Sequence, residues 1–106
     1  MRDYPVRRRL WKGATRERLM QLMEEVFGNA APEGEWVVSS RYPITEIRAA
    51  YVRRDNRVFL RVETRRDQEA DDEEFLEAMR DYNRFVELAT GYTAKERKKL
   101  LMKGTS

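Results

Sequence analysis

The sequence contains no cysteine and no histidine. Without these residues the chain offers no disulfide, no thiolate nucleophile and no zinc site built on Cys or His. A histidine general base is excluded too, and with it a Ser-His-Asp triad. The phosphate-binding motifs GxxxxGK[ST] and GxGxxG are also missing. These absences predict a protein that is not an enzyme and that uses no metal or other cofactor.

Long apolar runs are absent as well. No stretch approaches the roughly 20 apolar residues that a helix needs to cross a bilayer. The first six residues, Met1 to Val6, contain no apolar segment typical of a secretory signal. A chain without cysteine suits a reducing compartment. We therefore expect a cytoplasmic protein that does not bind a membrane.

Charge is abundant but unevenly placed along the 106 residues, a length that predicts one domain over residues 1–106. Residues 1–66 contain 15 Lys and Arg against 9 Asp and Glu, residues 67–92 contain 2 against 9, and residues 93–106 contain 5 against 1. A basic, acidic, basic order can attract a polyanion or pair with a second chain. The blocks can equally cancel across the folded surface, and the sequence leaves both possibilities open.

Apolar periodicity predicts the element order β-α-β-β-β-α-α. Residues 4–10 alternate like a strand, and Pro5 favours the edge of a sheet because it cannot donate a ladder hydrogen bond. Thr15 is expected to cap a helix that ends at Phe27, with Gly28 after it. Three further strands are expected at residues 35–40, 46–53 and 58–64, with a loop over residues 30–34 before them.

Two helices are expected in the last third of the chain. The acidic stretch 67–74 opens a long helix, where its carboxylates complement the helix dipole, and Gly91 ends it. A capping box from Thr93 to Glu96 opens a short basic helix over residues 93–103, an appendage to the domain, and residues 104–106 are expected to be disordered. The predicted fold class is α+β, an antiparallel sheet with helices packed on one face.

The hairpin between the last two strands gives the most detailed prediction. A two-residue turn at Asp55 and Asn56 pairs Arg53 with Val58, Tyr51 with Leu60, Ala49 with Val62 and Arg48 with Glu63. One face then carries apolar side chains for the core. The opposite face carries Arg48, Val52, Arg54, Arg57, Phe59, Arg61 and Glu63.

Arginines beside an exposed aromatic ring are typical of surfaces that bind single-stranded nucleic acid, because guanidinium groups contact phosphates and the ring stacks on a base. The predicted binding residues are Arg48, Arg54, Arg57 and Arg61 with Phe59, extended by Arg7, Arg8 and Arg9 near Trp11. The partner would be RNA or single-stranded DNA. In the competing interpretation these arginines form a solvated face and pair with Glu46, Glu63 and the acidic helix.

Two other functions remain open at this point. Partly exposed Trp11, Trp36, Phe59 and Tyr92, with the opposite charge blocks, also suit a protein-protein interaction module or a homodimer. The acidic residues between Asp67 and Glu74 could bind Mg²⁺ or Ca²⁺, but they lack EF-hand spacing, and helix-start electrostatics explains them more simply.

Three motifs carry a resemblance to a known family. They are Tyr4-Pro5-Val6-Arg7-Arg8, Tyr82-Asn83-Arg84-Phe85 and the segment from Thr90 to Lys99, Thr-Gly-Tyr-Thr-Ala-Lys-Glu-Arg-Lys-Lys. With these motifs the chain resembles a family of small uncharacterised archaeal proteins, known as a domain of unknown function. The resemblance spans nearly the whole chain. It implies an archaeal source and a compact α+β fold, and it implies no activity and no catalytic residue.

Overall fold

A computed structural model describes the backbone of residues 1–104 and the side chains of residues 1–100. Five antiparallel strands form one sheet in the order β1-β5-β4-β3-β2. The fold is α+β, as the sequence predicts. The strands and helices are β1 (Arg2–Pro5), a 3₁₀ helix (Arg8–Gly13), α1 (Arg16–Phe27), β2 (Ala31–Glu33), β3 (Trp36–Arg41), β4 (Ile44–Arg54), β5 (Arg57–Arg66), α2 (Asp72–Thr90) and α3 (Ala94–Gly104).

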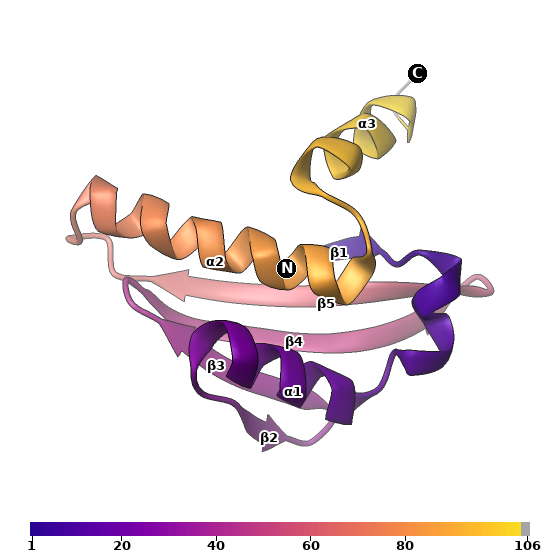
Figure 1. The fold of residues 1–106 in the computed structure, drawn as a ribbon, viewed down its shortest axis with the longest axis horizontal. Coiled ribbons are helices and arrows are strands. Elements are labelled where there is room, and N and C mark those ends of the chain that lie inside the picture. The colour runs from indigo at the N-terminus through magenta and orange to yellow at the C-terminus, as the bar shows by residue number, and fades with distance from the viewer. Residues whose placement is uncertain (105–106) are drawn as a thin grey trace.

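Helices α1 and α2 both lie against the same face of the sheet (Figure 1). Each helix presents an apolar stripe at helical spacing, which the sheet covers. Phe85 of α2 is fully buried and its ring lies 5.4 Å from that of Phe27 at the end of α1. Polar contacts also tie α2 to the sheet: Arg41 of β3 donates to Asp81 at 2.7 Å, and the Tyr51 hydroxyl donates to the Ala89 carbonyl at 2.6 Å.

Three caps of these helices are the predicted ones, whereas the start of α2 differs: the helix begins at Asp72 with Asp71 as its cap, so residues 67–70 lie before it. The Thr15 side chain accepts a hydrogen bond from the Arg18 amide at the start of α1. Gly28 and Gly91 follow α1 and α2 in the left-handed conformation, each with φ of 81°. Glycine adopts this conformation without the steric cost of a Cβ atom. The acidic residues 72–74 occupy the first turn of α2, where they complement the helix dipole.

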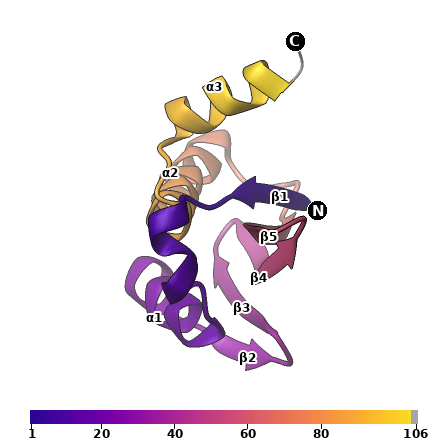
Figure 2. The same cartoon turned by 90° about the vertical axis from the view of Figure 1, so that its right-hand side faces the viewer.

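The hairpin of β4 and β5 has the predicted register. Arg53 pairs with Val58, Tyr51 with Leu60, Ala49 with Val62 and Arg48 with Glu63. Asp55 and Asn56 both have positive φ, 54° and 60°, as a type I′ turn requires. The apolar face of this hairpin is therefore the one that α1 and α2 cover, and the arginine-bearing face points away from both helices (Figure 2).

The N-terminal segment differs from the prediction of a strand over residues 4–10. Strand β1 ends at Pro5, and Arg8 to Gly13 form a 3₁₀ helix. The chain leaves the sheet because Val6 turns inward, where it is buried and its amide still donates to the Val58 carbonyl. Strand β1 does lie at the sheet edge, as Pro5 indicates.

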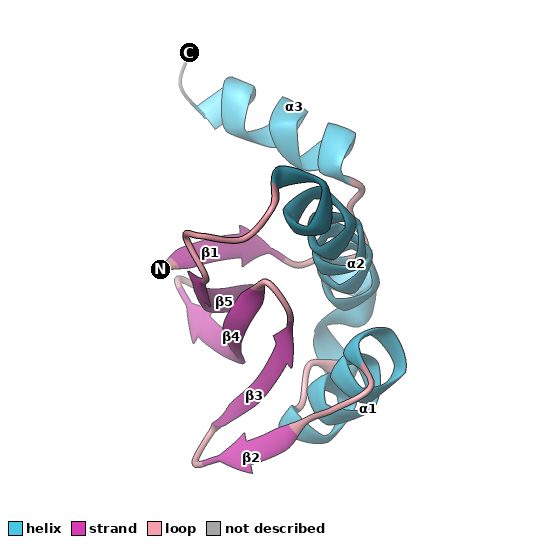
Figure 3. Cartoon of the chain, turned by 90° about the vertical axis from the view of Figure 1, so that its left-hand side faces the viewer, coloured by secondary structure: helices cyan, strands magenta, loops and turns pink. Residues whose placement is uncertain are grey.

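The other edge holds a strand that the sequence analysis treats as a loop. Residues Ala31–Glu33 form β2, three residues that pair with β3 and are all exposed (Figure 3). They lie in a stretch of Ala, Pro, Glu and Gly with no apolar alternation, so the strand leaves no pattern in the sequence. At the other end of the chain α3 runs to Gly104; the predicted disorder of residues 105 and 106 lies outside the described part of the chain.

Candidate nucleic-acid interface

The sheet face opposite α1 and α2 carries the arginines that the hairpin register assigns to it. Arg54 lies across from Arg57, and Arg48 across from Glu63, so their side chains leave the same face. Phe59, between them, is half-buried. The helices leave this face uncovered, but the ion pairs that its arginines make decide which of them are free to bind a ligand.

Asp3 of β1 holds two of the predicted binding residues. Its carboxylate accepts hydrogen bonds from Arg61 at 2.8 and 3.0 Å and from Arg54 at 3.2 Å. The hydrogen bond and charge of Arg61, together with Arg54, hold the pKa of Asp3 below its usual range. Arg54 and Arg61 therefore already neutralise a carboxylate of this chain.

Arg48 is held in a similar way. Its guanidinium lies 3.0 Å from a Glu33 carboxylate oxygen and 3.9 Å from that of Glu46. It also lies over the Trp36 ring, 5.4 Å from its centre. The pairing with Glu46 is the one expected if the arginines form a solvated face and pair with carboxylates of the same chain. With Asp3 and Glu33 also paired, the middle of this face lacks the excess positive charge that would attract a polyanion.

Arg7 has a structural role and does not extend an arginine track. Its Nε donates to the Gly91 carbonyl at 2.7 Å, its Nη2 pairs with Glu96, and its guanidinium lies 4.3 Å from the centre of the Tyr92 ring. These contacts join the N-terminal segment to the start of α3. Arg8 and Arg9 are exposed on the 3₁₀ helix, so they do not continue β1 as a strand would.

Three arginines without carboxylate partners, Arg8, Arg53 and Arg57, lie at the turn end of the β4–β5 hairpin. Two adjoining hollows of about 430 and 420 Å³ share Trp11, Arg57 and Val58 as lining residues. We call these two hollows together the turn-end groove. Its side walls carry Arg8, Arg53, Arg54, Arg57, Trp11, Phe59, Tyr92 and one carboxylate, Asp55. Among the described residues, Arg8, Arg53 and Arg57 make no ion pair.

Each aromatic ring of the turn-end groove lies beside a guanidinium group. Arg54 is 4.7 Å from the centre of the Phe59 ring, and Arg8 is 5.6 Å from that of Trp11. The Trp11 indole nitrogen donates to the Val6 carbonyl at 2.7 Å, which fixes the ring in place. Trp11 and Phe59 are both half-buried, and each ring has a guanidinium group beside it, so the exposed part of either ring can serve as a stacking surface.

Sequence reasoning missed Arg53, Trp11 and Tyr92 as members of one site. The register places Arg53 on the core face, with Val58. It is nevertheless exposed, because the β4–β5 hairpin extends beyond the part of the sheet that the helices cover. Trp11 reaches the groove only because Arg8–Gly13 form a 3₁₀ helix beside Val58. The basic segment from Arg7 to Lys12 places Trp11 beside arginines in the sequence, a signal that is weak when taken alone, and nothing in the sequence indicates that Trp11 lies beside Val58.

Among the residues that the structure describes, no group of three or more acidic side chains is placed to hold a metal ion. Asp71 caps α2 and residues 72–74 lie in its first turn, whereas Asp67 accepts a hydrogen bond from the Tyr42 hydroxyl at 3.0 Å. In the described part of the chain no helix is long and apolar enough to cross a membrane.

The fold and this surface define a small α+β domain with a basic, aromatic groove at one end of its sheet. The chain belongs to the family described as "Domain of unknown function (DUF5611)", whose model matches residues 1–103. It is similar to the NMR solution structure of a hypothetical protein from the archaeon Thermoplasma acidophilum, with 29% sequence identity and a TM-score of 0.64 over 95% of this chain and 97% of that one. No curated protein matches. The family that the three motifs suggest is thereby confirmed.

Proposed function

We propose that this protein binds single-stranded nucleic acid, RNA or DNA, in the turn-end groove. The observation that carries the proposal is the placement of three arginines without carboxylate partners, Arg8, Arg53 and Arg57, around the Trp11 ring. Guanidinium groups contact phosphate oxygens, and an aromatic ring stacks on any base. Four arginines against the single carboxylate of Asp55 give the groove a net positive charge.

This proposal divides the arginines of the hairpin into two groups. Arg57 and Arg8, with Arg53, bind phosphate, while Arg48 and Arg61 stay with Glu33 and Asp3. Arg54 borders the groove but shares Asp3 with Arg61, so it contributes less. The acidic first turn of α2, residues 72–74, lies at the end of this helix away from the hairpin turn, which keeps these carboxylates away from the bound strand (Figure 1).

Fluorescence anisotropy of a labelled 12-nucleotide RNA, and of the DNA of the same sequence, tests the proposal. Binding should weaken as the salt concentration rises. Removal of one arginine that contacts a phosphate should make the slope of log K against log salt concentration shallower by about 0.7. Arg53→Ala and Arg57→Ala should each weaken binding and reduce this slope. Trp11→Phe keeps a stacking ring, whereas Trp11→Ala should cost about 1–3 kcal/mol, or about 5- to 150-fold in Kd.

Arg65→Ala is the matched control. Arg65 is an exposed arginine on the same strand, β5, at the end away from the turn. Its removal changes the net charge of the protein by the same amount without touching the groove. Equal weakening by Arg65→Ala and Arg57→Ala would show that binding follows net charge alone and would overturn the proposed site. No binding at low salt would leave a protein-protein interaction module as the remaining hypothesis.

A further inference from the structure

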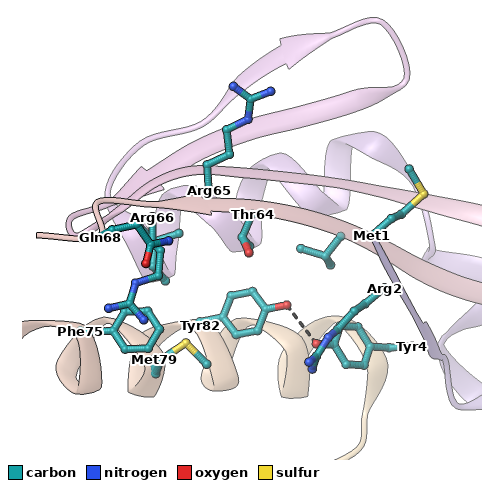
Figure 4. Close-up of a pocket in the computed structure, with 12 residues that line it drawn as sticks. Met1, Arg2, Tyr4, Thr64, Arg65, Arg66, Gln68, Phe75, Met79 and Tyr82 are labelled. Carbon is teal, nitrogen blue, oxygen red and sulfur yellow. Dashed lines mark hydrogen bonds between the residues drawn. The ribbon is translucent and has the colours of Figure 1, made fainter. Parts of the chain in front are cut away.

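A second cavity lies at the other end of the sheet, on the helix side. It has a volume of about 620 Å³ and opens between α2 and the paired strands β1 and β5 (Figure 4). Volumes of about 300–1,000 Å³ are typical of sites that bind small molecules. We call it the α2 cleft, and the side chains that matter for its chemistry are Arg2, Thr64, Arg66, Phe75, Met79 and Tyr82.

The walls of the α2 cleft combine apolar and polar side chains in nearly equal parts. Ile44 and Val62 of the sheet face Phe75 and Met79 of α2 across it. None of the described lining residues is an Asp or a Glu, although the acidic first turn of α2 is close in sequence to Phe75. An anion can therefore enter the cleft without meeting a carboxylate, and an apolar body can lie against its apolar side chains.

Two guanidinium groups lie at opposite ends of the cleft. The Arg66 guanidinium stacks 3.6 Å from the centre of the Phe75 ring, and its buried Nε has no hydrogen-bond partner among the described residues. Arg2 lies beside the Tyr4 hydroxyl at the other end, as Figure 4 shows. Neither arginine makes an ion pair with a described residue. A buried donor without a partner is costly, so an acceptor at Arg66 would be stabilising.

Between these ends, Tyr82 supplies a neutral hydroxyl. Burial, with the hydrogen bond to Tyr4 at 3.0 Å, raises the pKa of Tyr82, so this group stays protonated at neutral pH. Thr64 adds a second hydroxyl from β5, pointing into the cleft. The two hydroxyl groups and the two guanidinium groups thus supply hydrogen-bond donors and positive charge around the apolar side chains of the cleft.

We infer that the α2 cleft binds a small organic anion with an apolar body, whose acidic group is bound by Arg66 and whose body lies along Val62 and Met79. The α2 cleft lies on the helix side of the sheet, opposite the arginine-bearing face. It is also at the far end of the sheet from the turn-end groove. The inference therefore does not depend on nucleic-acid binding.

Octanoate is a suitable probe, and its binding can be followed by ¹H–¹⁵N correlation spectra of the full chain. Saturable shifts should centre on the amides of Thr64, Arg66 and Met79. The uncharged 1-octanol and the short anion acetate should each bind at least ten-fold more weakly, because each lacks one of the two features that the cleft recognises.

Two variants and one control make the test specific. Arg66→Met keeps an apolar stem over Phe75 and should weaken octanoate at least ten-fold. Thr64→Phe should block the cleft without changing any charge, and it is tolerable because Thr64 is exposed. Arg84→Met is the control, because Arg84 is an exposed arginine of α2 that does not line the cleft.

The proposal fails if octanoate causes no saturable shift or if the shifts centre outside the cleft. It fails equally if Arg84→Met weakens binding as much as Arg66→Met, or if octanol binds as tightly as octanoate. The ¹H–¹⁵N spectrum of each variant reports directly whether the fold is retained, so a loss of binding cannot be confused with unfolding.

Discussion

Adding one methyl group at Gly91 or at Gly28 should have different effects on stability, although the two glycines have the same backbone conformation. Each follows a helix with φ of 81°. An alanine in the left-handed region costs about 1–2 kcal/mol at either position. A Cβ atom at Gly28 meets no atom within 4 Å, whereas one at Gly91 lies 3.0 Å from both Arg7 Cδ and Leu10 Cδ1.

The difference between the two variants therefore isolates the close packing at Gly91. Leu10 Cδ1 is the end of a side chain and can move, but Arg7 is held by the Gly91 carbonyl and by Glu96. Overpacking of this kind costs about 1–3 kcal/mol. We expect Gly28→Ala to lose about 1–2 kcal/mol of unfolding free energy and Gly91→Ala to lose about 1–3 kcal/mol more.

Urea denaturation followed by circular dichroism measures both values under the same conditions. With equal m-values, the midpoint of Gly91→Ala should lie below that of Gly28→Ala. In thermal unfolding the gap should be at least about 4 °C for a domain of this size. Equal midpoints for the two variants would refute the packing of Arg7 and Leu10 against Gly91, and with it the docking of the N-terminal segment on the start of α3.

Three further substitutions test the fold. Phe85→Ala should lose about 3–5 kcal/mol of unfolding free energy, because Phe85 is fully buried against Phe27; a loss below 1 kcal/mol in urea denaturation would contradict this core. Thr15→Ala should cost about 1 kcal/mol by removing the cap of α1, whereas Thr15→Ser should restore most of it. Asp3→Asn should lower Tm at neutral pH and have little effect in acid. The pKa of Asp3 in the folded protein is lower than the unfolded value of 3.8, so the ionised carboxylate stabilises the fold above that pH. This stabilisation is lost as the pH falls through the folded-state pKa. A pH-independent difference in Tm between Asp3→Asn and the unmodified protein would show that Asp3 acts through something other than its charge.

The sheet and its register could be predicted because local signals agree with the global fold. Asp55 and Asn56 accept positive φ, which fixes the two-residue turn, and the alternation on either side then has one register that buries the apolar set. The start of α1 and the ends of α1 and α2 could be predicted for a similar reason, since Thr15, Gly28 and Gly91 are strong capping residues. In each case the deciding interaction lies within a few residues along the chain.

The composition of the candidate site could not be predicted in the same way. Which arginines are free depends on Asp3, which is 58 residues from Arg61 in sequence and reaches it only because β1 pairs with β5. The 3₁₀ helix that carries Trp11 forms where alternation of apolar and polar residues favours a strand. Tertiary contacts of Val6 with Val58 and of Arg7 with Glu96 override that local preference.

The most direct test of nucleic-acid binding uses the fluorescence of Trp11 itself. The chain has two tryptophans, so Trp36→Phe leaves Trp11 as the single reporter in the turn-end groove, and Trp11→Phe leaves Trp36, which lies under Arg48. Titration with an unlabelled 12-nucleotide single strand should quench Trp11 saturably, with the same Kd and salt dependence as the anisotropy measurement, and should leave Trp36 nearly unchanged. Unchanged Trp11 emission at saturating nucleic acid, or equal quenching of Trp36, would contradict binding in the turn-end groove.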